Sequence, residues 1–158
     1  MDAYPKQKLS PEWVTVGIER NTVTWAEGFA KYLVSKERKN ADGKIITQKN
    51  AHGKEYNVTV EPLTTSQIRR FFGEVKRISN SEDISLQKDA ILMLKPQLAY
   101  AVGRAKNRDD KIKDFYEQVS IAIDAIRIED KAQCEKDFGN FVKIYEAIVA
   151  YHKANNGK

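Results

Sequence analysis

From Thr64 onward, apolar residues recur three and four positions apart. This spacing places them along one face of an α-helix. In the first such segment, Thr64 and Gln67 form a capping-box pattern, in which the two side chains satisfy free backbone N–H groups at a helix start. Ile68 and the apolar positions after it then predict a helix with one buried face.

Further helical segments follow along the chain. Ser79 with Glu82 repeats the capping pattern and predicts a second helix. Pro96 is expected to end or kink that helix, because proline lacks the N–H group that a helix interior requires, and a short new helix is expected to start there. Apolar spacing across residues 112–126 predicts a long fourth helix.

The last predicted helix begins at a cap formed by Asp130 and Gln133 and ends at the Asn-Asn-Gly run of residues 155–157. Between Phe138 and Tyr151 it is apolar on almost every side. A helix of this kind either forms the centre of its bundle or is shared with another chain. We expect the first arrangement, with the second kept as an alternative.

The first sixty residues are less regular. Residues 23–38 have helical spacing, and two short apolar runs around the turn at residues 50–53 predict a β-hairpin. The whole pattern predicts an all-α fold, a single-domain bundle of about five helices with a small hairpin insertion near residues 44–60. In this one domain, residues 1–62 supply an N-terminal helix and an extended insertion, and residues 63–158 supply the helical core.

Composition narrows the class of protein. The chain has 158 residues, 41% hydrophobic and 31% charged, which suits one soluble domain. Its single cysteine, Cys134, excludes an internal disulfide framework and fits a reducing compartment. No stretch approaches the roughly 18 apolar residues of a membrane span. We therefore expect a cytoplasmic protein with no membrane partner.

Catalytic candidates are few. His52 and His152 lie far apart in the sequence, and Cys134 has no partner in a zinc-binding spacing. A glycine-rich phosphate loop is also missing from the sequence. We expect neither an enzyme nor a bound cofactor or metal, although a small nuclease that uses two carboxylates would leave no sequence signature.

Charge points to a polyanionic partner. Lys and Arg number 27 against 22 Asp and Glu, a net charge of +5. Residues 61–108 carry nine basic and five acidic residues, whereas residues 109–158 carry eight and ten. Cations on rigid helices can bind phosphates, although a solvated surface would look the same. The candidate RNA-binding residues on this basis are Arg69, Arg70, Lys76, Arg77, Lys95, Arg104, Lys106 and Arg108, with Tyr100 placed to contact a sugar or base.

Three blocks, residues 63–70, 94–104 and 141–153, together resemble the Csm small-subunit family of type III-A CRISPR effector complexes. The resemblance implies a non-catalytic, all-helical protein of antiviral defence, present in several copies. Its implied partners are crRNA and target RNA, the CRISPR backbone subunits, the large polymerase-like subunit and further copies of itself. A helical protein-interaction module of another assembly, without RNA contact, is the alternative.

Matching the blocks position by position extends the set of candidate RNA-binding residues. The first block contributes Gln67 beside its two arginines, and the second matches at three residues already named. The third block adds Lys143, His152 and Lys153. The segment of residues 36–62 has no counterpart that the resemblance identifies, and it is expected either to contact a neighbour or to be a disordered insertion.

Overall fold

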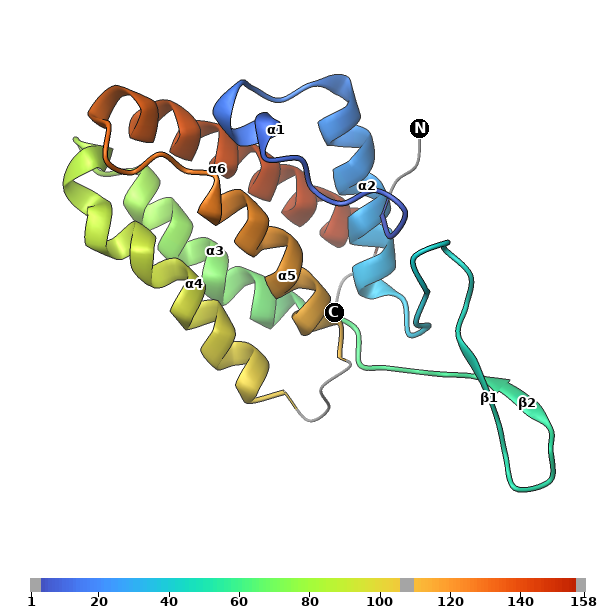
Figure 1. The fold of residues 1–158 in the computed structure, drawn as a ribbon. Coiled ribbons are helices and arrows are strands. Elements are labelled where there is room, and N and C mark those ends of the chain that lie inside the picture. The colour runs from blue at the N-terminus through green and yellow to red at the C-terminus, as the bar shows by residue number, and fades with distance from the viewer. Residues whose placement is uncertain (1–3, 106–109, 156–158) are drawn as a thin grey trace.

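The fold comes from a computed structural model that describes residues 4–105 and 110–155. The described part is an all-α bundle with one two-stranded antiparallel sheet, as the sequence predicts (Figure 1). The elements are α1 Glu12–Thr15, α2 Arg20–Val34, β1 Thr47–Lys49, β2 Glu55–Asn57, α3 Thr65–Ser79, the 3-10 helix η1 Ile84–Gln87, α4 Lys88–Gly103, α5 Lys111–Asp124 and α6 Lys131–Ala154.

Helix α6 is the centre of the bundle. It packs against α1, α2, α3, α5 and η1. Residues on several of its sides are therefore buried, including Phe138, Phe141 and Ile148. The prediction that the nearly all-apolar last helix is the core helix is confirmed.

Two of the predicted helix starts have the expected hydrogen bonds. The backbone N–H of Gln67 donates to Thr64 Oγ1 at 3.1 Å, and the N–H of Thr64 donates to Gln67 Oε1 at 2.9 Å. At the start of α6, the N–H of Gln133 donates to Asp130 Oδ1 at 2.9 Å. Both caps are confirmed.

Two expectations about the middle of the chain are wrong. The Ser79 cap does not form, because α3 continues through Ser79 and the next cap is Asp83, whose carboxylate accepts from the N–H of Ser85. Pro96 lies inside the continuous helix α4 and starts no new helix. Pro96 and Leu92 are both exposed. Proline has no N–H group, so the usual helical partner of the Leu92 carbonyl is missing at this point of α4.

The N-terminal region is more ordered than its sequence suggested. Helix α2 begins three residues before the predicted range and ends at Val34, because Ser35 is already extended. The short helix α1 was not predicted, and it buries Trp13 and Val14. The side chain of Asn140 on α6 donates to the Val14 carbonyl at 2.8 Å, which fixes α1 to the bundle.

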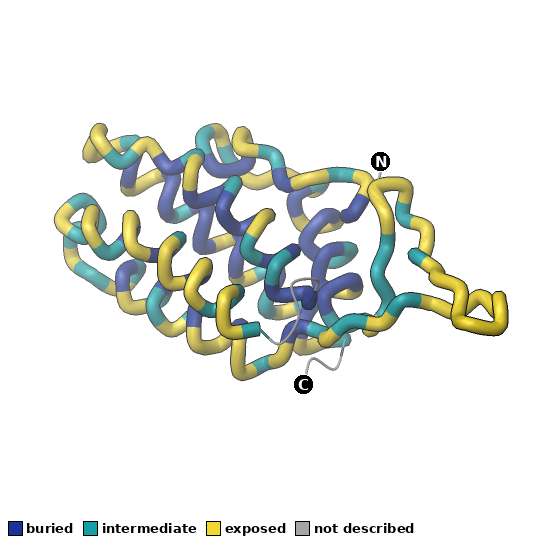
Figure 2. The backbone as a smooth tube through the Cα atoms, turned by 60° about the horizontal axis from the view of Figure 1, so that its bottom comes forward, coloured by how far each residue is buried: buried dark blue, intermediate teal, exposed yellow. Residues whose placement is uncertain are grey.

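The predicted hairpin is present and projects from the bundle. Strands β1 and β2 pair with Thr47 opposite Asn57 and Lys49 opposite Glu55. Gly53 closes the turn at a φ of +77°, a conformation that side chains other than glycine rarely adopt. Every residue of both strands is exposed, as Figure 2 shows at the end of the projection. We call residues 36–62 the arm.

A buried polar network holds the root of the arm. Lys111 is fully buried, and its ammonium group donates to the Tyr32 carbonyl and, at 2.9 Å, to the Ser35 carbonyl. Asp114, one turn later on α5, accepts from the Tyr32 hydroxyl at 3.1 Å and from Arg38 at 3.0 Å. The end of α2 and the start of the arm are therefore fixed to α5.

The other end of the arm returns to the same place. The N–H of Lys111 donates to the Glu61 carbonyl at 3.1 Å, and the N–H of Leu63 donates to the Leu33 carbonyl at 2.9 Å. The arm thus leaves and re-enters the bundle beside the end of α2 and the start of α5.

Burial of Lys111 makes the folding equilibrium depend on pH. Desolvation lowers the pKa of Lys111 from 10.5 to about 7, with the Asp114 carboxylate opposing the shift. Between these values the unfolded chain binds more protons than the folded chain, so stability rises with pH. We expect the unfolding free energy of the wild type, minus that of Lys111→Met, to increase by about 2 kcal/mol from pH 7 to pH 9. This is less than the full slope of about 1.4 kcal/mol per pH unit, because Lys111 of the folded chain is still partly protonated near pH 7.

Urea titrations at the two pH values measure this difference. The Lys111 resonances followed by NMR across the same range give the pKa directly, even if the variant is poorly folded. A difference that stays constant, with a Lys111 pKa above 10, would contradict the expectation.

Candidate nucleic-acid interface

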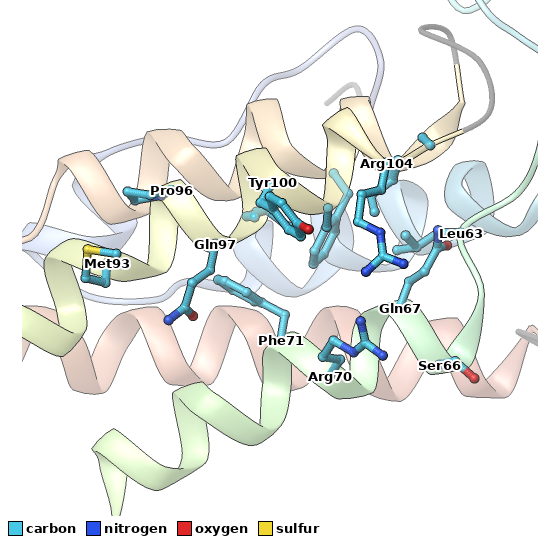
Figure 3. Close-up of a pocket in the computed structure, with 15 residues that line it drawn as sticks. Leu63, Ser66, Gln67, Arg70, Phe71, Met93, Pro96, Gln97, Tyr100 and Arg104 are labelled. Carbon is cyan, nitrogen blue, oxygen red and sulfur yellow. The ribbon is translucent and has the colours of Figure 1, made fainter.

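A groove of about 660 Å³ opens between α3 and α4, with α5 beneath it. Its floor is apolar, and its mouth carries polar and charged side chains (Figure 3). The described lining residues are Leu63, Ser66, Gln67, Arg70, Phe71, Met93, Pro96, Gln97, Leu98, Tyr100, Ala101, Arg104, Ala105, Ile112 and Phe115. Four of them, Gln67, Arg70, Tyr100 and Arg104, are among the predicted site residues.

Two arginines face each other across this groove. Arg70 extends from α3 and Arg104 from the residue that ends α4, and their guanidinium groups point into the same space (Figure 3). Both residues are exposed, and the described lining contains no Asp or Glu that could balance them. Two guanidinium groups that share a space without a carboxylate repel each other, and an anion between them removes that repulsion.

Aromatic and amide side chains stand beside the arginines. Tyr100 is 69% exposed, and its ring centre lies 5.8 Å from the guanidinium carbon of Arg104. Gln67 is held by its cap, with Oε1 accepting from Thr64, so its amide N–H₂ group is left to donate into the groove. These groups can contact a ribose or a base as well as a phosphate.

Three other predicted cations are engaged in ion pairs. Lys76 lies 3.1 Å from Glu146 on α6, and Lys95 lies 2.9 Å from Asp124 on α5. Arg77 pairs with Glu74 at 2.7 Å, which raises the pKa of the guanidinium through that hydrogen bond. Such exposed pairs contribute little to stability. Their local charge is nevertheless partly neutralised, so they are weaker phosphate ligands than the arginines of the groove.

The remaining predicted residues fall into three groups. Arg69 on α3 and Lys143 and Lys153 on α6 are exposed, but they do not line the groove. Lys106 and Arg108 lie outside the described residues. His152 is buried, and its Nε2–H donates to the Leu63 carbonyl at 2.8 Å.

The position of His152 gives it a structural role. Its hydrogen bond joins the end of α6 to the residue just before the Thr64 cap of α3. Its ring is 1% exposed and cannot reach a strand on the surface. His152 is therefore left out of the RNA-binding set considered below.

Sequence reasoning did not identify the floor of the groove or Gln97 as parts of a site. Phe71 was recognised only as an apolar position of a buried face, and nothing in one sequence shows that α4 leaves that face partly uncovered. Gln97 lies in the second resembling block, one turn before Ala101 and facing the groove. Its spacing of three from Tyr100 was the available signal.

Other kinds of site find no support in the described part of the chain. There, no group of three or more His, Cys, Asp or Glu side chains is arranged to hold a metal ion. None of the described helices is both long enough and apolar enough to cross a membrane.

Comparison with known proteins identifies a family. The family model described as Csm2 Type III-A matches residues 39–158, which is 120 of the 158 positions. Neither a curated protein nor a solved structure matches the chain. The matched range includes the arm from residue 39 onward.

Removing the His152 ring is expected to destabilise the fold. His152→Ala leaves the Leu63 carbonyl buried without its donor, which costs about 1–3 kcal/mol. Lys153→Ala, next to it and exposed, should change the unfolding free energy by less than about 0.5 kcal/mol. Chemical denaturation of both variants measures the difference, and equal stabilities would show that the buried hydrogen bond contributes nothing.

Proposed function

The chain belongs to the Csm2 Type III-A family, and we propose that, as a small subunit of the type III-A CRISPR complex, it binds RNA through its phosphates without catalysing a reaction. The observation that carries this proposal is the pair Arg70 and Arg104, which face one groove whose described lining contains no carboxylate. A phosphate placed there accepts hydrogen bonds from both guanidinium groups.

Backbone binding suits an RNA-guided complex. Pairing between guide and target reads the sequence, so a protein that supports the paired strands needs contacts that are independent of sequence. Guanidinium groups on two packed helices provide such contacts at a fixed spacing. Arg69 and the exposed lysines Lys143 and Lys153 extend the positive surface beyond the groove.

The proposed partners are crRNA and target RNA, together with other subunits of the complex. Those subunits are the CRISPR backbone subunits, the large polymerase-like subunit and further copies of this chain. Support for protein contacts comes from exposed apolar side chains on η1 and α4, namely Leu86 at 79%, Leu92 at 52% and Met93 at 51% exposure. Exposed apolar groups of this size are typical of protein interfaces.

The composition of the groove supports the proposed non-catalytic role. Its described lining has no His, Cys, Asp or Glu that could serve as nucleophile or general base. The subunit would act in antiviral interference by scaffolding RNA in the cytoplasm.

The salt dependence of RNA binding tests the proposal. Purified Csm complex carrying Arg70→Ala with Arg104→Ala should bind complementary target RNA more weakly than wild-type complex. The plot of log affinity against log salt should also be shallower, by about one unit for each phosphate that the variant no longer neutralises.

The matched control removes the same charge from another helix. Arg20→Ala with Lys31→Ala lowers the net charge equally on α2, which does not line the groove. This control should keep the wild-type slope, and both double variants should assemble and unfold like the wild type. If the groove variant binds target RNA as tightly as the control at every salt concentration, the groove is not an RNA site.

A further inference from the structure

The groove is deeper and more apolar than phosphate binding requires. Its floor includes Phe71, Leu98, Ile112 and Phe115, which are 6%, 3%, 4% and 1% exposed. The volume of about 660 Å³ lies within the range of small-molecule sites. A phosphate between two surface arginines needs only the mouth of this space, so the apolar interior calls for a second group on the same ligand.

The groups around the mouth match the parts of a nucleotide. Tyr100 presents an exposed ring next to the Arg104 guanidinium. Gln97 and Gln67 supply amide groups from α4 and α3 (Figure 3). Aromatic rings and guanidinium planes stack on unpaired bases, and an amide can both donate to and accept from a base edge.

We propose that the groove binds one unstacked nucleotide of an RNA strand. Its phosphate lies between Arg70 and Arg104, and its base lies against Tyr100 above the apolar floor, within reach of the Gln97 amide. This inference rests on the proposed RNA binding and adds a base-binding pocket to it. Because every base has an aromatic face and the floor is apolar, the pocket accepts any of the four bases.

A protein side chain is the competing occupant. An apolar residue of a neighbouring subunit would satisfy the floor equally well. It would, however, leave Arg70 and Arg104 without an anion, and they would be desolvated together at the mouth. A nucleotide satisfies the floor and the arginines with one ligand, which is why the observations favour it.

The test compares two RNA strands that differ only in their bases. The full-length chain is titrated with a single-stranded uridine pentanucleotide and, separately, with an abasic ribose-phosphate pentamer of equal charge. Affinity and the positions of contact are followed by NMR at one fixed, low salt concentration. We expect the strand with bases to bind about tenfold more tightly and to shift the side-chain amide resonances of Gln97 and Gln67.

Two variants separate the base from the phosphate. Tyr100→Ala should remove most of the difference in affinity between the two strands. Tyr56 is an exposed tyrosine on β2, and Tyr56→Ala should leave this difference in affinity unchanged. Arg70→Ala should lower the affinity for both strands by a similar factor. Tyr100 is largely exposed, so its replacement is not expected to unfold the chain.

The outcomes distinguish the two proposals. If both strands bind equally and Arg70→Ala weakens both, backbone binding stands and the nucleotide pocket is overturned. If the strand with bases binds more tightly but Tyr100→Ala leaves that advantage intact, the pocket is also overturned. If neither strand shifts groove resonances at millimolar concentration, while the assembled complex loses target RNA affinity on Arg70→Ala with Arg104→Ala, the pocket is overturned and a neighbouring protein is the better occupant of the groove.

Discussion

The packing around Tyr145 on α6 determines where the groove lies. The ring is fully buried and contacts Phe71 and Phe72 of α3, at centroid distances of 5.5 and 5.4 Å, and Phe115 of α5 at 5.7 Å. Its hydroxyl donates to the Ile68 carbonyl at 3.0 Å, so the polar end is satisfied as well. Burial raises the pKa of Tyr145 well above its ordinary value, which keeps the hydroxyl protonated as a donor. Tyr145 therefore helps to hold α3, the helix that carries Arg70, against α5 and α6.

This arrangement divides the basic residues into two kinds. Cations that reach across to α5 or α6, such as Lys95 and Lys76, meet carboxylates there and form exposed ion pairs. Cations at the open end between α3 and α4 have no such carboxylate within the described lining of the groove. The same residue types are thus paired with carboxylates at one place and left for the proposed ligand at another, and the packing of the helices determines which.

The sequence predicted what depends on local spacing. Helical periodicity and side chains three residues apart correctly placed the starts of α3 and α6, and alternation around a glycine turn placed the hairpin. The sequence-based prediction failed where contacts between residues far apart in the chain determine the structure. Pro96 lies inside α4, where its local sequence predicted a break. Lys111 is buried, with its ammonium group bonded to carbonyls at the end of α2. The candidate site was predicted in part, as a set of cations and Tyr100. The burial of His152 and the apolar floor depend on which helices meet, and spacing along one chain does not determine that.

The way the arm is attached to the bundle also allows the length of the arm to change. Both ends of the arm are tied to the first turn of α5, through Lys111 and through the Asp114 pairing with Arg38. The bundle is therefore constrained only by the distance between those two ends. The entropic cost of closing the loop between them grows slowly with the length of the loop. Residues can be gained or lost at the tip near Gly53 without disturbing the helices, so the reach of the arm can diverge among relatives while the bundle stays constant.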